Sequence, residues 1–403
     1  MSRIALLALA PAAVVSASCS HDLWLDSGPL DGDEPPACVE SIEPGLETYT
    51  LGVPSLSATT DGFLMAAVLG EDAGGGACRG PALLTLDDDG RLASDCRGSY
   101  DERDDTSLPQ AIALSSGGVA VLLNGSRESS RGLWLRLVPP AGEPPPAAPL
   151  LDADEPGFGT GVLVEEQPGT LLVAWKEVPG GGEARGFLRL RRYSALDGSP
   201  LGDGPVTLPD RNVWWPVALE PFGDGVAAAW IPVDGNSVHV VRLASDLSVS
   251  ATVDLPTPDD DRAIGIPSLA ARGERLAVAW AQAREGVGYH TELALLDGAT
   301  TVARGRWDRP TPPSIVGGSR VAIEDAGAFG WATLWAASDA STLFARFSDD
   351  TLSPLGPPPT LVSAGPCGLY GFATAWNGDA LAFACSESPS LRVFTWSCRP
   401  PAP

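Results

Sequence analysis

Val173-Ala174-Trp175, Ala228-Ala229-Trp230 and Val278-Ala279-Trp280 each end a short apolar stretch, and Thr333-Leu334-Trp335 repeats the pattern in altered form. The stretches lie about 50 residues apart, and segments rich in Gly and Pro separate them. A period of this length, built from strands and turns, is typical of a stacked repeat fold. We therefore predict an all-β protein in which each repeat is one four-stranded sheet, or blade, of a β-propeller.

Seven positions along the chain align on the tryptophan of this pattern, namely Val68, Leu123, Trp175, Trp230, Trp280, Trp335 and Cys385. The seventh repeat shows only three strands, the third of them over residues 391–396. Residues 47–51, ahead of the first repeat, resemble the fourth strands of other repeats. We predict a seven-bladed β-propeller whose last blade is closed by this N-terminal strand, because closure removes an open sheet edge. The four tryptophans should pack between blades.

The first 18 residues have the features of an export signal. Arg3 precedes an apolar stretch over residues 4–15, which is shorter than the roughly 20 residues that a membrane-spanning helix needs. Ser16-Ala17-Ser18 then precede Cys19, and small residues ahead of a Cys resemble the lipobox of bacterial lipoproteins, although Ser16 stands where a branched apolar residue is usual. We expect lipidation of Cys19; the alternative is a plain signal peptide cleaved near Ser18.

The predicted signal peptide sets the division of the chain into three segments. Residues 1–18 are the predicted signal peptide, residues 19–36 a polar tether, and residues 37–403 the propeller domain. The pattern over residues 37–398 resembles that of uncharacterised propeller-type lipoproteins of high-GC Gram-negative bacteria. This resemblance implies an exported protein of the cell envelope, either an outer-membrane lipoprotein or periplasmic, and it implies no particular activity.

The cysteines fit an oxidising compartment. Apart from Cys19 there are six, and an even number in an exported chain predicts disulfides, although six cysteines allow 15 connectivities. Two pairs each flank a predicted hairpin, and the remaining pair would join the two ends of the ring. The favoured pairs are Cys78 with Cys96, Cys367 with Cys385, and Cys38 with Cys398.

Charge excludes some partners. With 51 acidic and 26 basic residues the net charge is −25, which disfavours nucleic acid and anionic membrane surfaces. We expect membrane contact through the N-terminal lipid only, and a monomer. The chain has 3 His residues, too few for a usual zinc site, so we expect no metal and no cofactor. Calcium is the one possible ion, at Asp87-Asp88-Asp89-Gly90 or Asp259-Asp260-Asp261, but acidic hairpin turns are common.

Candidate binding residues lie where the linkers between blades enter the innermost strands, at the mouth of the central channel. Aromatic and Arg side chains there suit sugars or peptides, because they offer apolar area and fixed donors. For each tryptophan the alternative is packing between blades. The candidates are Arg211, Trp214, Trp215, Arg262, Trp307 and Arg309.

No catalytic signature stands out, since the chain lacks the nucleophile elbow, the P-loop and the His-Glu-x-x-His motif. We therefore favour a non-enzymatic binding or scaffold module of the cell envelope that presents its rim to a protein or glycan. The alternative is an envelope carbohydrate hydrolase or lyase at the channel mouth. It would use Asp261 and Asp308, with Arg262 or Arg309 on an anionic substrate, and its two carboxylates would need to lie about 5 to 10 Å apart.

Overall fold

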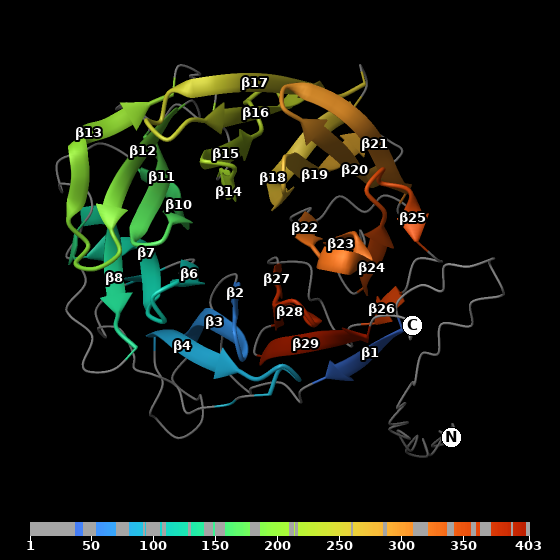
Figure 1. Ribbon diagram of the computed structural model, residues 1–403, viewed down its shortest axis with the longest axis horizontal. Coiled ribbons are helices and arrows are strands. Elements are labelled where there is room, and N and C mark those ends of the chain that lie inside the picture. The colour runs from blue at the N-terminus through green and yellow to red at the C-terminus, as the bar shows by residue number, and fades with distance from the viewer. Residues whose placement is uncertain are drawn as a thin grey trace, which may run out of the picture.

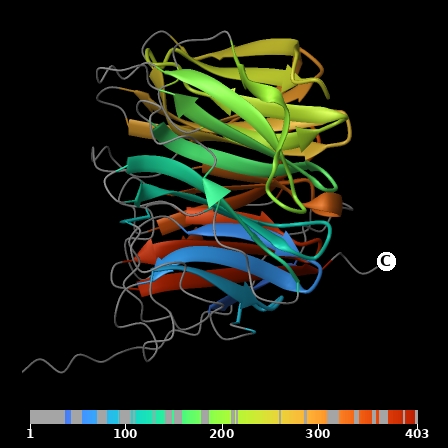
Figure 2. The same cartoon turned by 90° about the vertical axis from the view of Figure 1, so that its left-hand side faces the viewer.

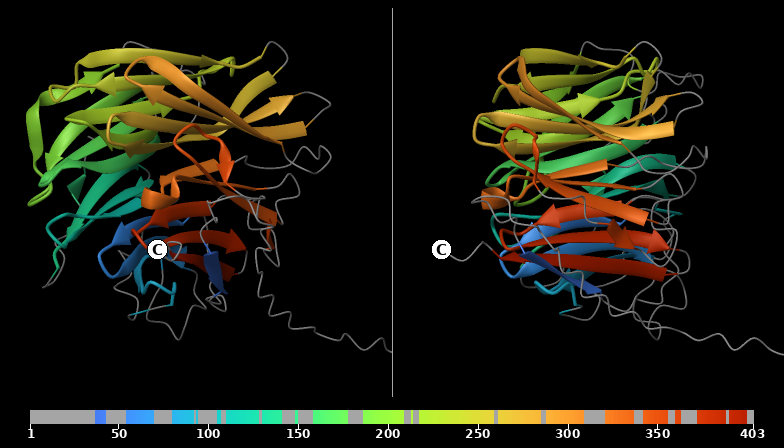
Figure 3. Two further views of the ribbon diagram at one scale, coloured as in Figure 1. Left: turned by 45° about the vertical axis from the view of Figure 1, so that its right-hand side comes forward. Right: turned by 90° about the vertical axis from the view of Figure 1, so that its right-hand side faces the viewer.

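The described part of the chain forms a ring of antiparallel sheets. The computed structural model describes residues 37–42, 54–69, 80–91, 93, 105–106, 110–127, 130–140, 148–149, 158–177, 186–208, 213, 217–258, 261–284, 288–308, 321–336, 342–355, 360–362, 372–387 and 390–399. The chain runs once around the ring (Figure 1), and the strands cross its thickness in the side views of Figures 2 and 3. The seven sheets confirm the predicted seven-bladed β-propeller.

Each blade begins with its innermost strand and continues outward. Blade 1 has β2 (Ser55–Thr59), β3 (Gly62–Leu69) and β4 (Gly80–Leu86). Blade 2 has β5 (Asp105–Thr106), β6 (Gln110–Ala113), β7 (Val119–Arg127), β8 (Ser130–Val138) and β9 (Ala148–Pro149). In blade 2, β5 and β6 both pair with β7. Blade 3 has β10 (Phe158–Gln167), β11 (Thr170–Glu177), β12 (Phe187–Ser194) and β13 (Pro200–Thr207).

The other half of the ring repeats this order. Blade 4 has β14 (Ala218–Phe222), β15 (Gly225–Trp230), β16 (Ser237–Leu243) and β17 (Val249–Pro256). Blade 5 has β18 (Asp261–Arg272), β19 (Arg275–Arg284), β20 (Gly288–Asp297) and β21 (Thr300–Asp308). Blade 6 has β22 (Val321–Asp325), the 3-10 turn η1 (Gly327–Phe329), β23 (Trp331–Ala336), β24 (Thr342–Ser348), β25 (Pro354–Leu355) and β26 (Thr360–Val362). In blade 6, β25 and β26 both pair with β24.

Blade 7 joins the two ends of the propeller. Its strands from the centre outward are β27 (Phe372–Trp376), β28 (Ala380–Glu387), β29 (Ser390–Arg399) and the N-terminal β1 (Ala37–Ile42). The predicted closure by an N-terminal strand is confirmed, and Figure 1 shows β1 beside β29. The strand that pairs with β29 is formed by residues 37–42 and not by the predicted residues 47–51, which lie outside the described residues; the β-branched Val39 and Ile42 suit a strand.

The core lies between neighbouring blades. All seven aligned positions fall in the second strand of a blade, and the four tryptophans Trp175, Trp230, Trp280 and Trp335 are at most 2% exposed, so the predicted packing is confirmed. Trp280, for example, packs with Val240 and Leu255 of blade 4. Each blade therefore buries apolar side chains against both neighbours, which holds the ring together through the hydrophobic effect.

The innermost strands are also linked by polar side chains. An innermost strand has backbone groups on its free edge that need partners. In blade 1, Ser55 Oγ accepts a hydrogen bond from the Ala111 N–H of blade 2 over 2.9 Å. The Gln110 amide makes two hydrogen bonds to the backbone of Leu163 in blade 3, of 2.7 and 3.1 Å. We call this series of contacts, one innermost strand to the next, the inner belt.

Candidate functional site

The end of blade 5 at which β18 begins carries the densest group of buried polar side chains in the described residues. Antiparallel pairing brings the start of β18, the end of β19, the start of β20 and the end of β21 to this one edge, with Asp261 opposite Arg284 and Gln282 opposite His290. This is the channel-mouth end at which the sequence predicted binding residues. We call it the blade-5 edge.

Three polar side chains at the blade-5 edge are almost fully buried: Asp261 is 3% exposed, Gln282 1% and His290 3%. Gln282 Nε2 donates to Asp261 Oδ2 over 3.0 Å, while the Trp280 indole donates to Gln282 Oε1 over 3.3 Å. The Asp261 main-chain oxygen accepts from Thr257 Oγ1 over 3.0 Å. These contacts fix the Asp261 carboxylate in place.

Charged partners flank the buried groups. Arg284 Nε lies 3.3 Å from Asp261 Oδ1. His290 Nε2 lies 3.1 Å from Glu292 Oε1 and 3.7 Å from Asp261 Oδ2. Within the described part of the chain, neither His290 Nε2 nor Asp261 Oδ1 has a hydrogen bond. Their partners are the charged groups Arg284 and Glu292, whose geometry differs from that of a hydrogen bond.

Exposed arginines stand on both faces of blade 5. Arg262 follows Asp261 on β18 and therefore lies on the opposite face of the sheet, whereas Arg304 and Arg306 are exposed on the outermost strand β21. Because they are two residues apart on a strand, Arg304 and Arg306 lie on the same face of the sheet. Arg306 Nε lies 4.0 Å from Glu292 Oε1. Asp308 stands opposite His290 at the same edge, so acidic and basic residues alternate there.

The structure places two of the six predicted binding residues. Arg262 is exposed near the start of β18, and its role in binding stays a prediction. Trp307 is 5% exposed; its ring stacks on Trp335 with centroids 6.4 Å apart, and the guanidinium of Arg346 lies 4.5 Å above it. Trp307 thus packs between blades 5 and 6, the alternative that the sequence left open. Arg211, Trp214, Trp215 and Arg309 lie outside the described residues.

Sequence reasoning missed Gln282, His290 and Glu292. His290 and Glu292 alternate along β20, so they share one face, and this spacing was a readable signal. Their approach to Asp261 depends on the pairing of three strands, which one sequence does not reveal. Asp261 itself was named as a carboxylate of the hydrolase alternative, and the structure shows it buried and engaged rather than open to a substrate.

A second polar feature involves two carboxyl groups of the innermost strands, Glu220 on β14 and Glu324 on β22. Burial raises the pKa of Glu220 to about 8, the charge of Glu324 adds to this rise, and a hydrogen bond from the Ala271 backbone opposes it. Burial likewise raises the pKa of Glu324 to about 7 against a hydrogen bond from Thr374. Both groups contact the next blade and so belong to the inner belt. Near neutral pH they hold protons that an ordinary glutamate would have lost.

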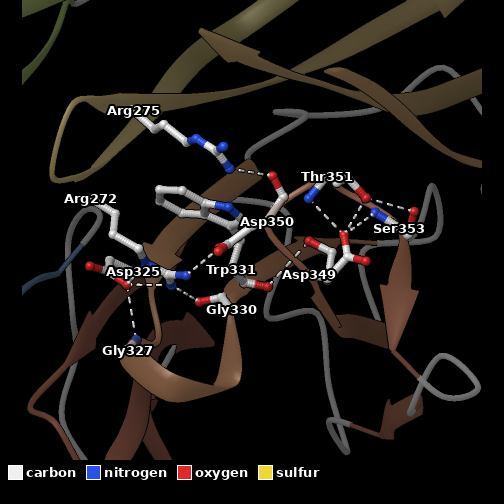
Figure 4. Close-up of polar contacts among 11 residues, drawn as sticks. Arg272, Arg275, Asp325, Gly327, Gly330, Trp331, Asp349, Asp350, Thr351 and Ser353 are labelled. Atoms are coloured by element: carbon white, nitrogen blue, oxygen red, sulfur yellow. Dashed lines mark hydrogen bonds and ion pairs between the residues drawn. The ribbon is translucent and has the colours of Figure 1, made fainter. Parts of the chain in front are cut away.

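At the opposite end of blade 5, Arg272 ties blade 5 to blade 6 (Figure 4). Its Nε donates to Asp325 Oδ1 and its Nη1 to Asp350 Oδ1, each over 2.7 Å. It also donates to the Gly330 carbonyl, and its guanidinium lies 4.4 Å above the Trp331 ring. These contacts stabilise the interface between two blades, far along β18 from the blade-5 edge.

Metal and membrane features were searched in the described residues. They contain no group of three or more His, Cys, Asp or Glu side chains suited to a metal ion. At the predicted calcium run, Asp87 Oδ1 accepts from the N–H groups of Asp89 and Arg91, the pattern of a capped turn. Asp259 and Asp260 lie outside the described residues, so calcium stays a prediction. No helix in the described ranges is long and apolar enough to cross a bilayer.

Comparison with known proteins supports the fold and shows no function for this chain. No family model and no curated protein sequence matches the chain. Among solved structures, it is similar to hydrazine synthase of Kuenenia stuttgartiensis, with a TM-score of 0.56 and 10% identity over 91% of this chain and 98% of that one. An α-L-arabinofuranosidase of Fusarium graminearum, in complex with an iminosugar inhibitor, has a TM-score of 0.52 and 11% identity over 87% of this chain and 98% of that one. At these identities the similarity shows a shared β-propeller fold alone.

Proposed function

We propose that this protein is a non-enzymatic binding or scaffold module of the cell envelope, which presents the channel-mouth end of its propeller to a glycan or protein. The blade-5 edge carries this proposal. Its carboxylate Asp261 is 3% exposed and engaged by Gln282 and Arg284. A buried, ion-paired carboxylate is poorly placed to attack a substrate or to transfer its proton, which favours binding over catalysis at this edge.

The location belongs to the same proposal. We infer export by residues 1–18, lipidation of Cys19 and attachment through the tether of residues 19–36, as an outer-membrane lipoprotein or a periplasmic protein. Three disulfides would suit that compartment. Cys38 and Cys398 stand directly opposite each other in the pairing of β1 with β29; neighbouring strands are close enough for such a bond. Cys78, Cys96 and Cys367 lie outside the described residues.

The experiment is a binding and turnover test on the purified exported protein. Neutral and acidic polysaccharides are titrated into it by calorimetry, and each mixture is then analysed for new reducing ends and for unsaturated sugars. We expect saturable binding to at least one glycan and no product. Release of sugar at a rate proportional to enzyme concentration would contradict the proposal.

The second candidate, a carbohydrate hydrolase, is favoured by a different observation. A carboxyl group that keeps its proton near neutral pH can act as a general acid, and the pKa values of Glu220 and Glu324 are raised to about 8 and about 7. If the turnover test finds product, Glu220→Gln and Glu324→Gln identify the groups responsible. Activity that survives both substitutions would exclude these two glutamates as the acid.

A further inference from the structure

We propose that a disulfide between Cys38 and Cys398 is a redox-sensitive lock that fastens the N-terminal strand β1 to β29 and so transmits a pull from the membrane tether to the propeller. This inference rests on the proposed function for the tether and for the disulfide, and it goes further by giving that bond a mechanical role. Two observations carry it. One neighbouring strand holds β1, and the two cysteines stand where a pull from the tether first acts on that strand.

The strand β1 is attached to its blade differently from other outermost strands. The strands β13, β17 and β21 each follow the third strand of their own blade directly along the chain and pair with it. In contrast, β1 and its partner β29 are the first and last strands of the described chain. A single ladder of six residue pairs joins them, beginning with Ala37 opposite Arg399. A terminal strand held by one neighbour opens more readily than the rest of a fold.

The partner strand β29 is fixed far more firmly. Its residues Leu391 and Phe394 are 0% and 2% exposed, and the Phe394 ring stacks on Phe383 of β28 with centroids 4.6 Å apart. Thr395 Oγ1 donates to the Asp89 carbonyl of blade 1 over 2.8 Å. The strand also pairs with β28 along its other edge. A pull on the N-terminus should therefore detach β1 and leave β29 in place.

The direction of the pull explains the position of the cysteines. The predicted tether ends at residue 36, and β1 begins with Ala37. Because the two strands are antiparallel, Ala37 lies at the C-terminal end of β29, and a pull from the tether opens the residue pairs one after another from this end. Cys38 and Cys398 form the second pair. A covalent bond there stops the opening after one pair, whereas a bond at the far end of β1 would leave the earlier pairs free to open.

The bond is open to redox control. Residues directly opposite in an antiparallel pair have Cα atoms about 4.5 to 5.5 Å apart, within the range of about 4.4 to 6.8 Å that a disulfide spans. A dithiol reductant such as dithiothreitol cleaves the S–S bond by thiol–disulfide exchange. Two electrons and two protons pass to the cysteine sulfurs, which become thiols, while the reductant closes into a cyclic disulfide. Reduction should therefore leave β1 held by its ladder alone.

The test is single-molecule force spectroscopy on the exported protein, held by one peptide tag beside Cys19 and another after Pro403. The disulfide closes a loop that contains the whole propeller, so the oxidised protein should lengthen only by its two tails. In dithiothreitol, β1 should open first, at a lower force than any blade, and unfolding of the propeller should then add on the order of 1,200 Å of chain. Such lengthening of the oxidised protein, or a reduced protein in which β1 is not the first part to open, would overturn the proposal.

Hydrogen exchange followed by mass spectrometry distinguishes a local lock from general stabilisation. In the double variant Cys38→Ala/Cys398→Ala, exchange in residues 37–42 should become at least about tenfold faster, while exchange in blade 4 changes less than about twofold. The matched control is Cys78→Ala/Cys96→Ala, which removes the pair predicted in blade 1 and should leave exchange in β1 unchanged. Both variants are first checked for an unchanged circular-dichroism spectrum.

The outcomes also separate this inference from the proposed function. Equal acceleration of exchange in all blades would overturn the lock and leave the disulfide in place as a general stabiliser. Glycan binding is measured independently by the calorimetric titration, so its failure would remove the proposed binding function without affecting the behaviour of β1 under force.

Discussion

The substitution Glu220→Gln should stabilise the protein at alkaline pH and leave it nearly unchanged at acid pH. The pKa of Glu220 in the folded protein is about 8, against a reference value of 4.5. Below pH 4.5 the carboxyl is protonated in both the folded and the unfolded state. As the pH rises toward 8 the unfolded state releases a proton that the folded state keeps, so the free energy of unfolding falls.

The magnitude follows from the same shift. Each pKa unit corresponds to about 1.4 kcal/mol, which sets an upper bound of about 5 kcal/mol on the destabilisation above pH 8. Because the side chain is only partly buried, solvent screening should reduce it to about 2 to 3 kcal/mol. Glutamine is neutral at every pH and keeps an oxygen that can accept from the Ala271 backbone.

The assay is urea unfolding followed by tryptophan fluorescence, at pH 5, 7 and 9, for the wild type and Glu220→Gln. We expect the free energies of unfolding to differ by less than about 1 kcal/mol at pH 5 and the variant to be more stable by about 2 to 3 kcal/mol at pH 9. Glu324→Gln should show the same gain in the free energy of unfolding at alkaline pH, which should level off near pH 7. A difference that does not depend on pH, or a variant less stable at pH 9, would refute the reasoning.

Three further predictions concern the ring. Arg272→Gln should lower the free energy of unfolding, measured in urea, by about 2 to 3 kcal/mol, because it removes contacts to Asp325, Asp350 and Trp331. Arg275→Gln loses one exposed hydrogen bond and should cost under about 1 kcal/mol. Equal losses would contradict the role of Arg272 in joining blades 5 and 6. Trp280→Ala should cost about 3 to 5 kcal/mol by the same method, since Trp280 is fully buried between blades, and a loss below 1 kcal/mol would argue against that packing. Intact-mass measurement of the exported protein should show three disulfides and one diacylglyceryl group, and Cys38→Ala should lower stability by about 2 to 4 kcal/mol; six free thiols would be the contrary result.

The fold could be predicted from the sequence because the repeated pattern occurs in the most buried strand of each blade. The tryptophan positions mark the second strand of every blade, where apolar side chains meet both neighbouring blades and little variation is tolerated. The closing strand was harder to identify. Residues 47–51 and 37–42 are both short and plausible edge strands, and the choice depended on pairing with β29 across the whole chain.

The candidate site was only partly predictable. Arg262 and Asp261 could be named as candidates because the start of an innermost strand identifies the channel mouth, and both lie at the start of β18. Gln282 and His290 could not be named in this way, because the role of a buried polar residue in an apolar strand depends on which residue lies opposite it in the sheet. Trp307 was named as a binding candidate but packs in the core. An aromatic residue at a strand end suits a ligand site or the core equally, and only the structure shows that Trp307 stacks on Trp335.

The most direct test of the binding account is a crystal structure of the exported protein with a short glycan that binds it in the calorimetric titration. We predict an intact sugar chain at the channel-mouth end of the propeller. A ligand bound beside Glu220 and Glu324 instead, or a cleaved one, would contradict the account and favour the hydrolase.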